Sequence, residues 1–157
     1  LVNTEMTRLP RSELTRVLNA QGGINTPIIH APDANYVLYS LDYIKGEGYS
    51  RFKDWLFKRG ILGWRHTFDC DNYAEAFRVF MQIVHSKAQT DKDDNSKKQS
   101  VAVGVIWYER DGRGGHAINI IVTKIDDKLT VRFIEPQDGK EVELSKSEKE
   151  SIFFVLI

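Results

Sequence analysis

Apolar side chains recur at helical spacing in three segments of the first half of the chain, and they predict three amphipathic helices. The segments are residues 9–19, residues 50–59 and a third that begins near residue 70 and ends near residue 86. A proline near the start of the first and a glycine after the second suit a helix start and a helix end. The apolar positions are Leu14, Val17, Leu18, Phe52, Trp55, Leu56, Tyr73, Phe77, Phe80 and Val84. Between the first two helices, residues 36–39 are predicted to be extended.

From residue 101 onward the pattern changes to the alternation of half-buried strands. The predicted strands are VAVGVIWYE (101–109), HAINIIVTKI (116–125), LTVRFIE (129–135), EVEL (141–144) and IFFVLI (152–157). Because short turns join several of them, the sheet is expected to be mostly antiparallel. A helical N-terminal half packed on such a sheet makes the predicted fold class α+β, in a single domain over residues 1–157.

The two halves are separated by SKAQTDKDDNSKKQS, residues 86–100, which has almost no apolar side chain. Such a segment cannot bury one of its faces, so a mobile surface loop is predicted there. The RDGRGG segment, residues 110–115, has glycines and arginines without the spacing of a phosphate-binding loop, and it is interpreted as a hairpin loop.

Composition narrows the class of protein. The chain carries 22 basic and 22 acidic residues, so no net field attracts nucleic acid or an anionic membrane. No apolar run approaches the roughly 18 residues that span a bilayer, and a soluble protein is expected. A single cysteine excludes an intramolecular disulfide and a zinc site built from several cysteines. No signal-like segment follows Leu1, which favours the cytoplasm without fixing the compartment or the oligomeric state.

That cysteine, Cys70, lies in FDCDNYAEAFRVF, where a loop is expected to become the third helix. Backbone N–H groups at a helix N-terminus stabilise a thiolate, the reactive form of cysteine. A free cysteine is also commonly a small buried hydrophobe. The polar neighbours Asp69, Asp71 and Asn72 argue against simple burial and favour a chemical role.

Of the four histidines, His116 is the best placed to act as a base for this thiol. It follows a glycine-rich loop and opens a predicted strand, a common position for functional groups. His66 is kept as an alternative because it lies four residues before the cysteine. His30 and His85 are interpreted as structural.

Strand alternation predicts a partner for His116. In LTVRFIE the odd positions are apolar, so Glu135 shares the inward face, and in HAINIIV the position of His116 is inward as well. Both side chains are therefore expected to face the helices. If the IDDK turn pairs the two strands, His116 falls opposite or diagonal to Glu135, and a buried carboxylate needs such a partner.

Together these residues predict a nucleophile, a base and an orienting acid in Cys70, His116 and Glu135. Gln137 follows Glu135 and is expected to orient the imidazole or line the site. The backbone N–H of Cys70 would meet an oxyanion. A mononuclear metal site formed by Cys70, His116 and an acid is a weaker alternative, because the close ligand pairs of zinc sites are missing.

The motifs DCDNYA, GHAIN and IEPQ, in this order, resemble those of papain-like and transglutaminase-like cysteine hydrolases. The closest resemblance is to the Cys-His-Glu protease-like domain of mushroom agglutinins and its bacterial and phage relatives, and it spans about residues 64–137. It implies a papain-like fold and gives the triad roles to Cys70, His116 and Glu135.

The same resemblance implies further features of the site. Trp64 and Gly115 are expected to flank it, and Ile118 stands where many relatives have an aromatic residue. Calcium at Asp69 and Asp71 is the one ion it suggests, and no cofactor is expected to be required.

The leading hypothesis is a cysteine peptidase or amidase that acts on a peptide or amide through a thioacyl-enzyme. Transglutaminase-type acyl transfer would use the same residues. The alternative from another class is a non-catalytic papain-like binding module, for example a phage or host-interaction protein, that keeps the same residues as a polar network.

Overall fold

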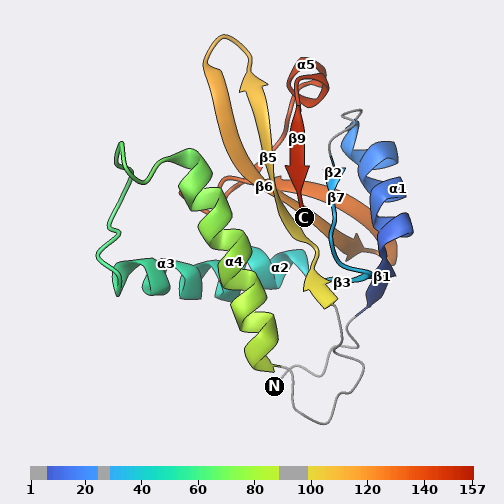
Figure 1. The fold of residues 1–157 in the computed structure, drawn as a ribbon, viewed down its shortest axis with the longest axis horizontal. Coiled ribbons are helices and arrows are strands. Elements are labelled where there is room, and N and C mark those ends of the chain that lie inside the picture. The colour runs from blue at the N-terminus through green and yellow to red at the C-terminus, as the bar shows by residue number, and fades with distance from the viewer. Residues whose placement is uncertain (1–6, 25–28, 89–98) are drawn as a thin grey trace.

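The computed structural model describes residues 7–24, 29–88 and 99–157, and it has a mixed α+β fold, as predicted (Figure 1). The helices are α1 (Arg11–Gly22), α2 (Leu41–Tyr43), the π-helical turn η1 (Ile44–Gly48), α3 (Tyr49–Phe57), α4 (Cys70–Ala88) and α5 (Lys146–Glu150). The strands are β1 (Arg8–Pro10), β2 (Ile29–His30), β3 (Asn35–Val37), β4 (Gln99–Val101), β5 (Val103–Arg110), β6 (Gly114–Ile125), β7 (Lys128–Ile134), β8 (Glu141–Val142) and β9 (Phe154–Leu156).

The strands form two sheets. The larger has six strands in the order β2-β9-β5-β6-β7-β8, and the smaller has three in the order β1-β3-β4. The central pairs β5–β6 and β6–β7 are antiparallel, while β2–β9 and β3–β4 are parallel. Helix α1 covers one face of the large sheet, and α4, with α3 beside it, covers the other (Figure 1). These two faces are called the α1 face and the α4 face below.

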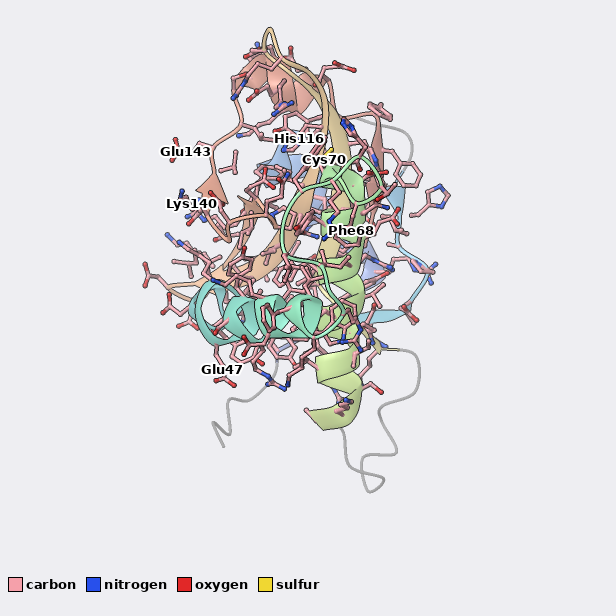
Figure 2. All side chains as sticks on the ribbon, turned by 90° about the vertical axis from the view of Figure 1, so that its left-hand side faces the viewer. Glu47, Phe68, Cys70, His116, Lys140 and Glu143 are labelled. Atoms are coloured by element: carbon pink, nitrogen blue, oxygen red, sulfur yellow. The ribbon has the colours of Figure 1, made fainter. Side chains whose placement is uncertain are left out.

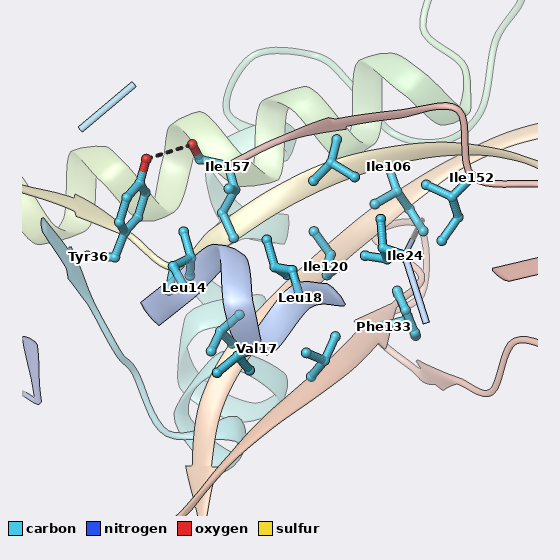
Figure 3. Close-up of a cluster of buried hydrophobic side chains, with 14 of the residues drawn as sticks. Leu14, Val17, Leu18, Ile24, Tyr36, Ile106, Ile120, Phe133, Ile152 and Ile157 are labelled. Carbon is cyan, nitrogen blue, oxygen red and sulfur yellow. Dashed lines mark hydrogen bonds between the residues drawn. The ribbon is translucent and has the colours of Figure 1, made fainter. Parts of the chain in front are cut away.

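The α1 face is an apolar layer in which the helix lies against β5, β6 and β7 (Figure 3). Leu14 and Leu18 of α1 are completely buried there, as their spacing predicted. The Tyr36 hydroxyl donates a hydrogen bond to the carbonyl of Ile157 at 3.2 Å, which anchors the last residue to the core. Gly104 of β5 lies on this face, where a Cβ atom would stand 2.5 Å from the Leu156 carbonyl oxygen.

The α4 face is built from aromatic rings and is also tied by hydrogen bonds. Phe52 of α3 and Phe77 of α4 meet edge to face with ring centroids 4.9 Å apart. Asn119 of β6 donates from Nδ2 to the carbonyls of Ala74 in α4 and Gly104 in β5, both at 2.9 Å. The helix is therefore fixed to the sheet by polar contacts as well as by packing.

A two-residue turn sets the register of the β6–β7 hairpin. Asp126 and Asp127 have φ angles of 49° and 60°, the left-handed values that a tight hairpin turn requires. Asn119 then pairs with Ile134, and the ladder runs back to Ile125 opposite Lys128. Because strand side chains alternate, this register decides which residues of the two strands meet on each face.

The elements differ from expectation in several places. The predicted strand 101–109 is interrupted at Ala102, whose N–H donates to the Val37 carbonyl while its own carbonyl accepts from Val122 N. The part before the break pairs with β3 in the small sheet. Helix α4 runs on to Ala88 and β4 begins at Gln99, so both ends of the predicted 86–100 loop are regular structure. The middle of that loop lies outside the described residues.

Helix α5 was not predicted. Its N-cap Ser145 and the side chain of Glu148 form a reciprocal capping box. None of the helices in the described part of the chain is long and apolar enough to span a membrane.

Candidate functional site

The predicted start of the third amphipathic helix is confirmed, since α4 begins at Cys70. The Tyr73 N–H donates to the Asp69 carbonyl at 3.0 Å, and the Asn72 side chain accepts a hydrogen bond from the Asp69 N–H at 3.2 Å. The loop before the helix is held by a bridge between Arg65 and Phe68. The turn into α4 is therefore fixed on both sides of the cysteine.

The Cys70 side chain is half-buried and packs as an apolar group. It lies against a small cluster formed by Ala74 of α4, Val105 of β5 and Ala117 of β6, with Trp107 beside it. Within the described residues, no hydrogen bond or ion pair involves the thiol. The environment on the α4 face is thus that of a packed thiol at the edge of the core.

His116 and Glu135 form the predicted pair. His116 Nε2 and Glu135 Oε2 are 2.7 Å apart, and their side chains are 8% and 20% exposed. The Gln137 N–H donates to the other carboxylate oxygen of Glu135 at 3.2 Å. The ring of Tyr108 meets the imidazole edge-on with centroids 6.0 Å apart. The diagonal contact expected from strand alternation is confirmed.

The His116–Glu135 pair and Cys70 pack on different faces of the large sheet. Alternation along β6 places His116 on the α1 face, with Ile118 and the other apolar residues packed under α1, whereas Cys70 packs beside Ala117 on the α4 face. His116 and Glu135 therefore face helix α1, and the predicted proximity of the imidazole to the thiol stays a prediction. Figure 2 shows Cys70 and His116 at the same end of the molecule, where α4 begins. Among the described residues, no hydrogen bond joins the thiol to the imidazole.

Two carboxylates flank the cysteine. One ligand atom each from Asp69, Cys70 and Asp71 lies within 4.8 Å of the others. A side-chain hydrogen bond with Asp71 raises the pKa of Asp69, and partial desolvation adds to the rise. Two carboxylates provide at most four of the roughly six to eight oxygens that surround calcium, and a thiol is not a calcium ligand. The donor set alone does not make a calcium site, and calcium here stays a prediction.

The remaining predicted site residues are on the surface. Trp64 is 52% exposed and its ring meets that of His66 at 4.9 Å, edge to face. Gln137 and Gly115 are exposed, and a Cβ on Gly115 would be 3.6 Å from Glu109 Oε1. No hydrogen bond or ring contact links Trp64 to Cys70 or His116 within the described ranges.

The other two histidines make contacts of their own. His85 is 2% exposed, and its Nδ1 is 3.2 Å from the Tyr39 hydroxyl. Burial, followed by the charge of Arg8, lowers the pKa of His85. His30 of β2 packs against the ring of Phe154 with centroids 5.2 Å apart.

Sequence reasoning missed Asn119 as part of this region. It is completely buried, and its Oδ1 has no hydrogen-bond partner among the described residues. The available signal was an amide side chain inside the apolar strand HAINIIV. A buried amide in such a strand predicts a tertiary hydrogen bond, here the one that positions the first turn of α4.

Two solved structures share this fold over nearly the whole chain. One is titled "PSL1a-E64 complex", with 19% identity, a TM-score of 0.73 and coverage of 96% of this chain and 51% of that chain. The other is a Polyporus squamosus lectin bound to a human-type influenza-binding epitope, Neu5Aca2-6Galb1-4GlcNAc, with 20% identity, a TM-score of 0.71 and coverage of 96% and 49%. This chain thus spans about half the length of each. No curated protein matches it.

These comparisons correct the functional prediction. The chain matches a protein family described as "Agglutinin C-terminal", and one of the two structural neighbours is described as a lectin. Neither description is of a peptidase. The assignment to papain-like cysteine hydrolases, the peptidase or amidase activity and the peptide substrate are therefore contradicted. The comparisons support the alternative, a non-catalytic binding module. The match covers residues 50–141, more than half of the chain, and the protein belongs to the Agglutinin C-terminal family.

Proposed function

We propose that this chain is a binding module that recognises a glycan at the polar end of its sheet, around His116, Glu135 and Gln137. The scaffold is a papain-like arrangement, in which a helix starting at Cys70 packs on an antiparallel sheet, used here for recognition. The residues predicted for catalysis become ligand-facing or supporting groups.

The observation that carries the proposal is the hydrogen bonding of the His116–Glu135 pair. Glu135 accepts from Gln137 N with one oxygen and holds His116 Nε2 with the other. The imidazole is thereby fixed in orientation, while its Nδ1 has no hydrogen-bond partner among the described residues. A fixed nitrogen at a partly exposed site suits the hydroxyl groups of a sugar, because a preorganised polar group loses little freedom on binding.

Two further exposed groups would take part in binding. Gln137 offers an exposed amide, and Trp64 offers an exposed aromatic ring on the loop that leads into α4. Amide groups donate and accept hydrogen bonds, and an indole presents an apolar face together with an N–H donor. This combination of groups suits a ligand that has both hydroxyls and apolar C–H faces.

The comparisons support a glycan as the class of ligand. The Polyporus squamosus lectin was solved with a sialylated trisaccharide. That protein is about twice as long as this chain, so the transfer of glycan binding to this half is part of the proposal.

The test is a glycan-array screen followed by calorimetric titration of the best ligand. His116→Ala and Glu135→Gln are expected to weaken binding at least tenfold, since each removes a hydrogen bond to a charged or oriented group. Cys70→Ala is expected to bind within about threefold of the parent, because the thiol packs without a polar partner. Lys128→Ala, at the far end of the hairpin, is the matched surface control.

Two results would contradict the proposal. One is the absence of any glycan ligand for the parent protein, and the other is parental affinity in both pair variants. Thermal unfolding of each variant, recorded alongside, separates a lost contact from a lost fold. Repeating the titration with calcium and with a chelator, in the parent and in Asp71→Asn, tests the predicted calcium contribution.

A further inference from the structure

Three exposed apolar side chains lie within one short segment that runs from the last residue of α3 toward α4. Of the large hydrophobic side chains that are exposed in the described residues, Phe57 (69%), Leu62 (69%) and Trp64 (52%) lie between the end of α3 and the approach to α4. The other two, Val79 and Phe153, lie singly on other elements. Single exposed apolar residues are ordinary on a protein surface, whereas a group of them marks an interaction site.

This segment, residues 57–66, is named the basic loop, and it projects from the body of the protein. It forms the outer edge of the molecule in Figure 1. A Cβ atom on Gly60 or on Gly63 would meet nothing within 4 Å. The base is nevertheless fixed, because Ile61 N donates to the Leu56 carbonyl at 3.1 Å and Arg65 N donates to the Phe68 carbonyl at 3.1 Å. The loop therefore presents its side chains on a defined backbone.

The charge of the basic loop has one sign. Its sequence, FKRGILGWRH, contains Lys58, Arg59 and Arg65 and no acidic residue. All three cations are exposed. The whole chain has 22 basic and 22 acidic residues, so this local excess of positive charge does not show in the net charge.

We infer that the basic loop docks on an anionic lipid surface. Phe57 and Leu62 would enter the boundary between headgroups and acyl chains, while the cations contact lipid phosphates and carboxylates. An indole such as that of Trp64 is a side chain that favours this interfacial depth. A protein partner fits less well, because protein interfaces deplete lysine at their core and need a broad complementary area rather than a projecting tip.

Vesicle co-sedimentation tests the inference with lipids that carry no sugar, so the result is independent of the proposed glycan site. The protein is expected to sediment with phosphatidylcholine vesicles that contain phosphatidylserine and to stay in solution with phosphatidylcholine alone. Phe57→Ser with Leu62→Ser is expected to lower the partition coefficient at least tenfold. Lys58→Gln with Arg65→Gln is expected to lower it several-fold and to reduce its salt dependence.

Matched controls use the same chemistry elsewhere on the surface. Val79→Ser with Phe153→Ser removes exposed apolar side chains outside the loop, and Lys128→Gln with Lys146→Gln removes exposed cations. Both pairs are expected to bind vesicles like the parent. Trp64 stays unchanged throughout because the proposed glycan binding also uses its ring.

Equal partition of the parent into neutral and anionic vesicles would overturn the inference, as would parental binding by the loop variants. So would loop variants that bind vesicles normally but lose self-association in sedimentation-velocity runs, which would make the loop a contact between two copies of the chain. Leu62→Asp, a single change at a 69% exposed position, provides a folded test if the double variant is unstable.

Discussion

The two faces of the large sheet are covered by helices in different ways. On the α1 face the helix lies on mostly aliphatic side chains of β6 and β7. Leu156 and Ile157 pack so closely against Gly104 of β5 that a Cβ atom would have no room there. On the α4 face aromatic rings fill the space, and Asn119 hydrogen-bonds the helix to the strands. The α1 face therefore depends on close packing, whereas on the α4 face hydrogen bonds also fix the position of the helix along the sheet.

This difference matters because the candidate site draws on both faces. The His116–Glu135 pair lies at the end of the α1 face, and Cys70 lies at the end of the α4 face. A substitution that disturbs the packing of one face should therefore alter the half of the site on that face more than the other half. Single substitutions on each face test that separation.

Gly104→Val should have the largest effect, because the new side chain would collide with backbone and side-chain atoms of Leu156 and Ile157. We expect a loss of about 4 kcal/mol or more in the free energy of unfolding, measured by urea denaturation. Gly63→Ala, where a Cβ meets nothing within 4 Å, is the matched control and should change stability little. A well-folded Gly104→Val protein would show that the packing of the α1 face can accommodate a larger side chain at this position.

Phe77→Ala tests the aromatic packing of the α4 face. The ring is completely buried and contacts Phe52, so its removal leaves a large cavity and should cost about 4 kcal/mol in urea denaturation. Leu18→Ala is the counterpart on the α1 face and should cost about 3 kcal/mol. A much smaller loss for Phe77→Ala would mean that aromatic packing does not hold α4.

Asn119→Leu tests the polar tie of the α4 face. It leaves the carbonyls of Ala74 and Gly104 without the donor they share, which should cost about 2 kcal/mol. Hydrogen exchange should rise in the first turns of α4 and stay unchanged in the β6–β7 hairpin. Thr123→Val, which removes one hydrogen bond to the Tyr39 carbonyl, is the control and should cost about 1 kcal/mol. Uniform exchange changes across both regions would contradict the separation of the two faces.

His85 should give the smallest effect, as a pH dependence. Burial lowers the pKa of His85, so the folded state favours the neutral ring. Its contribution to stability is present above the unfolded-state pKa of about 6.5 and is lost as the pH falls through that value and below it. Melting temperatures recorded from about pH 8 to about pH 5 should fall less steeply for His85→Phe than for the parent. Parallel curves would show that His85 does not contribute to this dependence.

Local pattern was enough to predict the hairpin half of the site. His116 and Glu135 are on neighbouring strands whose alternation and turn are readable from the residues between them, and their pairing follows. The start of α4 at Cys70 was readable for the same reason, from the apolar stripe behind it. These are features that a short stretch of chain determines by itself.

The features that were missed depend on distant contacts. Alternation shows that a strand has an inner face but not which helix covers it, so the sequence could not assign His116 to the α1 face and Cys70 to the α4 face. The break at Ala102 depends on strand β3, far away in the sequence. Helix α5 is a different case, because the Ser145 to Glu148 capping box was visible in the sequence and only its short length hid it.

The turn at Asp126 and Asp127 also determines the order in which the parts of the site form during folding. The hydrogen bond between His116 and Glu135 spans 19 residues of one hairpin, a structure that closes on a timescale of about 1–10 μs. The tie between Asn119 and Ala74 spans 45 residues and must wait for α4 to dock, because longer loops close more slowly. We therefore expect a refolding chain to form its histidine–carboxylate pair before it ties α4 to the sheet beside Cys70.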